Sequence, residues 1–181
     1  MGAALKNGFA NLTNFSGRDS RSLFWWWVLF IVIVTVGLGF VSGIVFTAGA
    51  MGGAFQSAAG GIDEAQIEAD MMRSMAGTLG TQAWVGVAIS LLGLGLLIAS
   101  FVRRLRDAGL PVIIAIIPVI TTLIAAYANI SVVDEMREVM MTGNAQAVEE
   151  ATAANLGLGL VGYLGHLVVI ICGLIPTRAA D

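Results

Sequence analysis

The apolar run LFWWWVLFIVIVTVGLGFVSGIVFTA, residues Leu23 to Ala48, decides the fold class. It contains no Asp, Glu, Lys or Arg, and it is longer than the roughly 20 residues that cross a hydrocarbon core. Because lipid offers no partners to backbone polar groups, such a run satisfies them internally as an α-helix. It also exceeds the apolar core of about 7–15 residues found in cleaved signal peptides. We therefore expect an uncleaved signal anchor.

Three further apolar runs follow at about residues 83–101, 110–128 and 156–175, and none contains Asp, Glu, Lys or Arg. The whole chain is 57% hydrophobic and 12% charged, whereas a soluble domain averages about 45–50% and 25%. We predict a single all-α membrane domain covering residues 1–181. It is a bundle of four transmembrane helices.

The charges predict the orientation of this bundle. Seven of the nine Lys and Arg residues lie before the first run, in the 102–109 turn or in the C-terminal tail. The two longer loops, about 49–82 and 129–155, hold nine of the twelve acidic residues and only Arg73 and Arg137. The positive-inside rule places the basic segments in the cytoplasm. Both termini are therefore predicted to be cytoplasmic, which agrees with an even number of spans.

Apolar residues recur at helical spacing in both long loops and near the N-terminus, and this pattern predicts short amphipathic helices there. They are Ile62, Ala65, Ala69, Met72, Met75 and Leu79; Val132, Val133, Met136, Val139 and Met140; and Leu5, Gly8, Phe9, Leu12 and Phe15. The glycine-rich stretch from Gly49 to Gly61 predicts a flexible linker.

Small or weakly polar residues recur at spacings of three, four or seven positions in each span, with Phe46 and Leu97 filling two of the slots. They are Thr35, Gly39, Ser42 and Gly49; Gly86, Ser90, Gly93 and Ser100; Pro111, Ala115, Pro118, Thr122, Ala125 and Asn129; and Asn155, Gly159, Gly162, His166 and Gly173. Helices in lipid associate through close backbone approach at such residues, and this spacing favours a left-handed bundle. Pro118, inside the third span, predicts a kink.

Two kinds of side chain in the spans are candidates for specific roles. Trp25, Trp26 and Trp27 directly follow the basic N-terminal segment and are expected to be interfacial anchors. At least one should face protein, and we expect it to contact the basic turn. His166 and Asn129 are the intramembrane polar candidates, and an ionisable group at such depth is a functional candidate. The favoured interpretation of His166 is structural, with a hydrogen bond to a neighbouring helix.

Two motifs flank the spans on the basic side. The first is Phe15-Ser16-Gly17-Arg18, continued by Arg21 and Phe24-Trp25-Trp26, and the second is Arg103-Arg104-Leu105-Arg106-Asp107-Ala108-Gly109. Together they resemble the bacterial inner-membrane family known only as domain-of-unknown-function 805. That family shows Phe-Ser-Gly-Arg, Arg and Phe-Trp before its first span and Arg-Arg-Leu-His-Asp-x-Gly before its third.

The chain departs from that pattern in three places. Arg106 stands where the family has His, Leu110-Pro111 replaces the usual Ser-Gly-Trp, and the tail lacks the usual glycine- and asparagine-containing ending. The resemblance implies a location in the bacterial inner membrane. It implies no activity.

The two motifs bring seven charged residues to one predicted cytoplasmic face: Arg18, Asp19, Arg21, Arg103, Arg104, Arg106 and Asp107. Asp19 is expected to pair with Arg103 or Arg104, and Asp107 with Arg18 or Arg21. Surplus positive charge there could hold an anionic lipid headgroup. The alternative is that these charges only set the topology.

The sequence offers little for chemistry. With one His and the single cysteine Cys172, neither a metal site nor a nucleophile–base arrangement can be assembled, so we expect no cofactor, no metal and no enzymatic activity. The chain lacks the basic surface that nucleic-acid binding requires. We expect a structural or accessory subunit that contacts membrane lipids and associates with other membrane proteins or with itself. The alternatives are a small transporter or channel and an anionic-lipid-binding protein.

Overall fold

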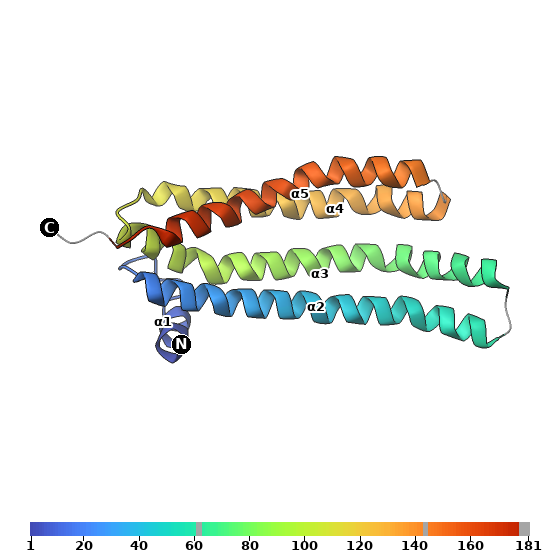
Figure 1. The fold of residues 1–181 in the computed structure, drawn as a ribbon, viewed down its shortest axis with the longest axis horizontal. Helices are drawn as coiled ribbons and strands as arrows, with labels where there is room; N and C mark the ends of the chain where they lie inside the picture. The colour runs from blue at the N-terminus through green and yellow to red at the C-terminus, as the bar shows by residue number, and fades with distance from the viewer. Residues whose placement is uncertain (61–62, 143–144, 178–181) are drawn as a thin grey trace.

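The computed structural model describes residues 1–60, 63–142 and 145–177. These residues form helices and connecting segments, without a strand among them. The elements are α1 (Gly2–Ala10), α2 (Arg21–Ala59), α3 (Glu64–Asp107), the 3-10 helix η1 (Val112–Ala115), α4 (Ile116–Thr142) and α5 (Ala145–Leu174). Figure 1 shows α2 to α5 running lengthwise as a bundle, with α1 set across one end.

Three stretches of helix in the described residues are long and apolar enough to cross a membrane: Arg21–Gly49, Ala69–Asp107 and Val112–Arg137. A shorter apolar stretch, Leu160–Leu174, lies in α5. These four stretches overlap the four apolar runs of the sequence. The fold is therefore all-helical, with three to four helices suited to spanning a membrane.

The helices extend well beyond the predicted spans. The glycine-rich linker prediction is wrong, because α2 continues without a break to Ala59. The short amphipathic helices predicted in the two long loops are likewise not separate elements. They are parts of α3, which begins at Glu64, and of α4, which continues to Thr142. The intervening sequences contain no proline, so the backbone hydrogen bonds continue past the point where hydropathy falls. Ile62 of the predicted pattern lies outside the described residues.

The predicted N-terminal helix is present as α1 and ends at Ala10, before Leu12 and Phe15. It packs on the start of α2 through Gly8. A Cβ built on Gly8 would lie 2.2 Å from the Trp27 ring, so only glycine permits this approach. The Phe9 ring meets Trp27 edge-on, with ring centroids 5.1 Å apart.

Helix contacts occur at some of the predicted small residues. A Cβ on Gly93 of α3 would lie 3.1 Å from the Thr35 methyl group of α2, and one on Gly162 of α5 would lie 3.1 Å from the Cβ of Ala125. The tightest contact involves Gly165, which the predicted pattern omits, and Thr121. Pro118 lies in the first turn of α4, which begins at Ile116. Proline is tolerated in a first helical turn, so this position does not require the predicted kink.

The apolar core lies at one end of the bundle, between α2, α3, η1 and α5. It comprises Phe24, Phe101, Val102, Leu105, Ala115, Val169 and Cys172. We call this end, where α2 starts and α3 and α5 finish, the basic end. The first and last described segments of the chain both lie there (Figure 1). The core therefore sits directly beneath the charged motifs.

Candidate functional site

The second motif is placed by the way α3 ends. Gly109 adopts a left-handed conformation with φ of 71°, which glycine permits without strain. The Leu110 N–H donates to the Leu105 carbonyl at 2.8 Å, and the Gly109 N–H donates to the Arg106 carbonyl at 3.2 Å. These two bonds form a Schellman cap. They fix the last turn of α3, which carries the arginines.

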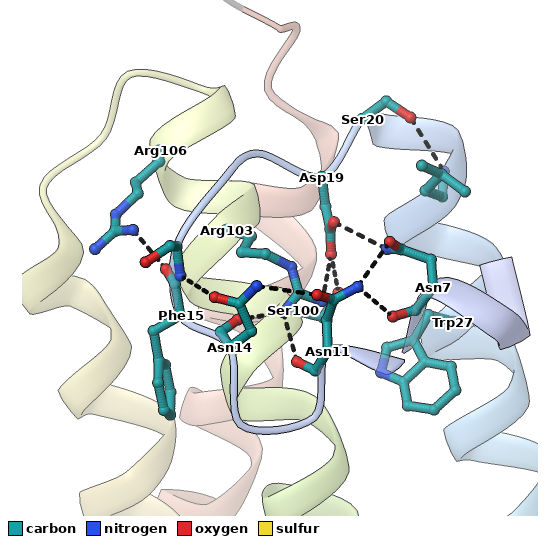
Figure 2. Close-up of polar contacts among 12 residues, drawn as sticks. Asn7, Asn11, Asn14, Phe15, Asp19, Ser20, Trp27, Ser100, Arg103 and Arg106 are labelled. Carbon is teal, nitrogen blue, oxygen red and sulfur yellow. Dashed lines mark hydrogen bonds and ion pairs between the residues drawn. The ribbon is translucent and has the colours of Figure 1, made fainter. Parts of the chain in front are cut away.

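Asp19 lies at the centre of the site and is only 4% exposed. Its carboxylate accepts from Arg103 Nη2 at 2.9 Å, from Ser100 Oγ at 2.8 Å and from Asn7 Nδ2 at 3.1 Å. These partners come from α3 and α1, so one carboxylate links three parts of the chain (Figure 2). The predicted pairing of Asp19 with Arg103 is confirmed, and it is the Arg104 option that drops out.

Arg103 holds the connection between α1 and α2. Its Nη1 donates to the backbone carbonyl of Asn11 at 2.7 Å and to that of Asn14. Its side chain is buried, and Nε has no hydrogen-bond partner among the described residues. The guanidinium therefore fastens the 11–20 connection to the end of α3.

Three asparagines, linked by hydrogen bonds, support this arrangement. Their role was not predicted from the sequence. Asn11 Nδ2 donates to Asn7 Oδ1 at 3.1 Å, and Asn14 Nδ2 donates to Asn11 Oδ1 at 3.0 Å. Figure 2 shows these amides in a row beside Asp19 and Arg103. Their spacing of four and three was the available signal, since it places side chains on one side of a helical turn.

Arg104 is the most deeply buried charge in the described residues, at 0% exposure. It pairs with Asp107, donates to the Gly173 carbonyl at 3.3 Å and also donates to the Ile175 carbonyl. It thus occupies the C-terminal end of α5, where unpaired carbonyls favour a cation. Asp107 also accepts from Thr177 Oγ1 at 2.8 Å.

The prediction that Asp107 pairs with Arg18 or Arg21 is wrong. Asp107 lies three residues after Arg104, and this spacing brings the two side chains together on one helix face. Arg18 and Arg21 are exposed and make no hydrogen bond or ion pair with described residues. Arg106 is also exposed and donates to the Phe15 carbonyl.

This arrangement separates the charges into two layers. The two described acids of the basic end, Asp19 and Asp107, are buried and each is paired with a buried arginine. Among the described residues of this end, the exposed charged side chains are the cations Lys6, Arg18, Arg21 and Arg106. Of the predicted charges, Arg178 and Asp181 in the tail lie outside the described residues. The site therefore presents a basic rim around a neutralised, buried interior.

The three tryptophans have three different surroundings. Trp27 is 2% exposed and donates through Nε1 to the Leu96 carbonyl at 2.9 Å. Trp25 is partly buried and donates to the Gly173 carbonyl at 3.1 Å, while Trp26 is 42% exposed. The expectation that one faces protein is confirmed. The hydrogen bonds reach Leu96 of α3 and Gly173 of α5 rather than the basic turn, while Trp25 packs against the core cluster that includes Val102 and Leu105. The expected contact with the basic turn therefore stays a prediction.

His166 and Asn129 each bond to their own helix. His166 Nδ1 lies 3.0 Å from the Gly162 carbonyl oxygen, and Asn129 Nδ2 donates to the Ala125 carbonyl at 2.8 Å. The expected bond from His166 to a neighbouring helix is therefore wrong, since the carbonyl four residues earlier is closer at hand. Among the described residues, no group of three or more His, Cys, Asp or Glu could hold a metal ion.

The long apolar helices, together with charged groups gathered at one bundle end, define the class of helical membrane proteins. The chain belongs to the family described as "Protein of unknown function (DUF805)", whose family model matches residues 12–181. This match confirms the resemblance carried by the two motifs. No curated protein and no solved structure was found to match the chain.

Proposed function

We propose that this chain is a four-span protein of the bacterial inner membrane, with both termini in the cytoplasm, and that it acts as a non-enzymatic accessory subunit. The orientation is supported by the basic rim, since seven of the nine Lys and Arg residues lie on one predicted side. It is also supported by the position of the first and last described segments at the same end.

The proposal of an accessory role rests on the exposed apolar surface of α2. The stretch Arg21–Gly49 is the most apolar of the three membrane-length stretches. Yet only 6% of its most apolar window is buried within the chain, against 28% for each of the other two. Beyond the core residues at its start, this helix therefore presents most of its surface outward.

The small residues on α2 favour a partner helix on that surface. Gly39 and Gly43 form a Gly-x-x-x-Gly pair, and a Cβ built on either would meet no described atom within 4 Å. Both glycines thus leave open space beside the helix where a side chain would otherwise stand. Such a pair allows another transmembrane helix to approach closely. The partner helix belongs to a larger membrane complex or to a second copy.

Substitution of both glycines tests the accessory role. Gly39→Ile with Gly43→Ile should abolish association of the full chain, purified in mild detergent and sized by light scattering and by mass spectrometry of co-purifying proteins. Gly37→Ile is the matched control, because Gly37 also has open space around it but does not belong to the pair. A wild-type chain that migrates as a monomer without any partner contradicts the proposal.

Binding of anionic lipid is a second candidate, favoured by the basic rim. Because Asp19 and Asp107 are already paired inside, they leave the charge of Arg18 and Arg21 uncompensated. Each cation near an anionic surface contributes about 1 kcal/mol. Arg18→Gln with Arg21→Gln should therefore weaken retention of phosphatidylglycerol, measured by native mass spectrometry from mixed phosphatidylglycerol–phosphatidylcholine nanodiscs.

The control for lipid binding is Arg73→Gln. Arg73 is exposed and pairs with Asp70 at 3.1 Å on the acidic side of the chain. Retention of phosphatidylglycerol should be unchanged in this variant. Equal retention in the wild type and the double variant would rule out the rim as a lipid site.

A further inference from the structure

A partly open cavity of about 430 Å³ lies between the helices in the apolar part of the bundle. Its volume falls in the range of about 300–1,000 Å³ that is usual for small-molecule sites. Most of its walls are aliphatic, and Trp25 lines it as well. Each of the four long helices also contributes one polar side chain to the wall: Thr35, Ser90, Thr122 and His166. An apolar cavity with a few polar groups is the usual form of a ligand site.

The hydrogen bond of His166 determines what its free nitrogen offers. Nδ1 lies 3.0 Å from the Gly162 carbonyl oxygen, and a carbonyl oxygen can only accept. Nδ1 therefore carries the hydrogen. In a neutral imidazole the other nitrogen, Nε2, is then an acceptor. Nε2 has no partner among the described residues.

The other polar groups of the wall also offer acceptors. Thr35 Oγ1 donates to the Ile31 carbonyl at 2.9 Å, and Ser90 Oγ donates to the Gly86 carbonyl at 2.9 Å. Each hydroxyl has used its single hydrogen, so lone pairs are what it has left. Thr122 makes no hydrogen bond with described residues, so its hydroxyl can accept a hydrogen bond as well as donate one. A complementary ligand is therefore apolar and donates a hydrogen bond.

We propose that this cavity binds a membrane-soluble alcohol, an apolar chain or ring system with one hydroxyl group that donates to Nε2 of His166. A phospholipid acyl chain would match the aliphatic walls but would leave the acceptors unpaired, which is costly in an apolar medium. A cation would find no acidic side chain among the lining residues. The hydroxyl is the group that satisfies both the walls and the acceptors.

The test compares bromododecanol with its methyl ether, which has the same chain but no O–H. Bromine quenches tryptophan fluorescence on contact, and Trp25 lines the cavity. The full chain carries Trp26→Phe and Trp84→Phe, because both rings are exposed, and is titrated in detergent micelles. We expect the alcohol to bind about three- to tenfold more tightly than the ether, the effect of one hydrogen bond in a membrane interior.

Variants assign this preference to the cavity. His166→Phe should bind alcohol and ether equally, while His166→Gln keeps an acceptor oxygen and should keep the preference. Ser90→Phe should weaken both probes, because it fills the cavity. Leu167→Phe is the matched control, since Leu167 is exposed next to His166 but does not line the cavity.

Two outcomes would overturn the inference, and the first needs no variant. Equal affinities of the alcohol and the ether for the chain with native His166 would exclude a hydroxyl ligand and identify an acyl chain as the occupant. Binding that is unchanged in Ser90→Phe would place the probes elsewhere.

Discussion

The basic end and the opposite end of the bundle are held together by different forces. At the basic end, Asp19 and Arg104 join separate elements through buried ion pairs and hydrogen bonds. At the opposite end, Arg73 pairs with Asp70 three residues away on one exposed helix face, and Arg137 of α4 donates to the Ala76 carbonyl of α3 at 3.3 Å. Both ends use arginine–aspartate pairs, but the pairs of the basic end are buried and the Arg73–Asp70 pair is exposed.

The comparison shows where this chain concentrates its tertiary specificity. An exposed pair contributes about 0–1 kcal/mol, because water screens it. Breaking a buried pair by removing one partner costs about 3–5 kcal/mol, because the other charge is left without compensation. The buried pairs of the basic end therefore contribute more to how the helices meet than the exposed pair of the opposite end does. The predictions below test this difference.

Arg104→Met should give the largest effect. The substitution leaves Asp107 charged and buried and removes the donor to two carbonyls at the end of α5. We expect the free energy of unfolding in mixed micelles to fall by about 3–5 kcal/mol. Arg73→Met, the equivalent change at the opposite end, should change it by less than about 0.5 kcal/mol. Similar losses for the two variants would show that the ends do not differ.

Asp19→Asn should rank second. The amide keeps the shape of the side chain but removes the charge that faces Arg103 at 2.9 Å. Because the amide oxygen can still accept from Arg103, we expect less than the full cost of a broken pair, a loss of about 1.5–3 kcal/mol, the contribution of a hydrogen bond to a charged group. A double-mutant cycle with Arg103→Met should show strong coupling, because the two residues contact each other directly. Additive losses would argue against the pair.

The sequence predicted the membrane class and part of the site for a simple physical reason. Runs without charge can be recognised locally, and so can a basic side. The Asp19–Arg103 pair was one of two options, since both motifs had to reach the same face. These conclusions needed only short-range information.

The rest depended on contacts between distant segments. Arg104 reaches the carbonyls of Gly173 and Ile175, and that contact depends on where α5 ends. The full length of α2 was also missed, because hydropathy falls at the edge of the lipid while backbone hydrogen bonding does not. The Gly8–Trp27 contact belongs to the same class, since a single glycine gives no sign of which ring packs on it.

Gly8→Ala should rank third and tests the packing of α1 at the basic end. The added methyl would lie 2.2 Å from the Trp27 ring, and overpacking of this kind costs about 1–3 kcal/mol. We expect faster amide hydrogen exchange in α1 and a shift in tryptophan emission. Gly2→Ala, at the exposed start of the same helix, meets no atom within 4 Å and should leave both signals unchanged.

Gly52→Ala should give the smallest effect, and one of opposite sign. Gly52 lies in the outer extension of α2, exposed and with no described atom within 4 Å of an added Cβ. Alanine there meets no obstacle and lowers the conformational entropy of the unfolded chain, so the helix gains about 0.5–1 kcal/mol. Amide hydrogen exchange in residues 49–59 should slow. If instead it accelerates, glycine at this position serves a contact outside the chain, and the opposite end has a constraint beyond the Arg137–Ala76 hydrogen bond.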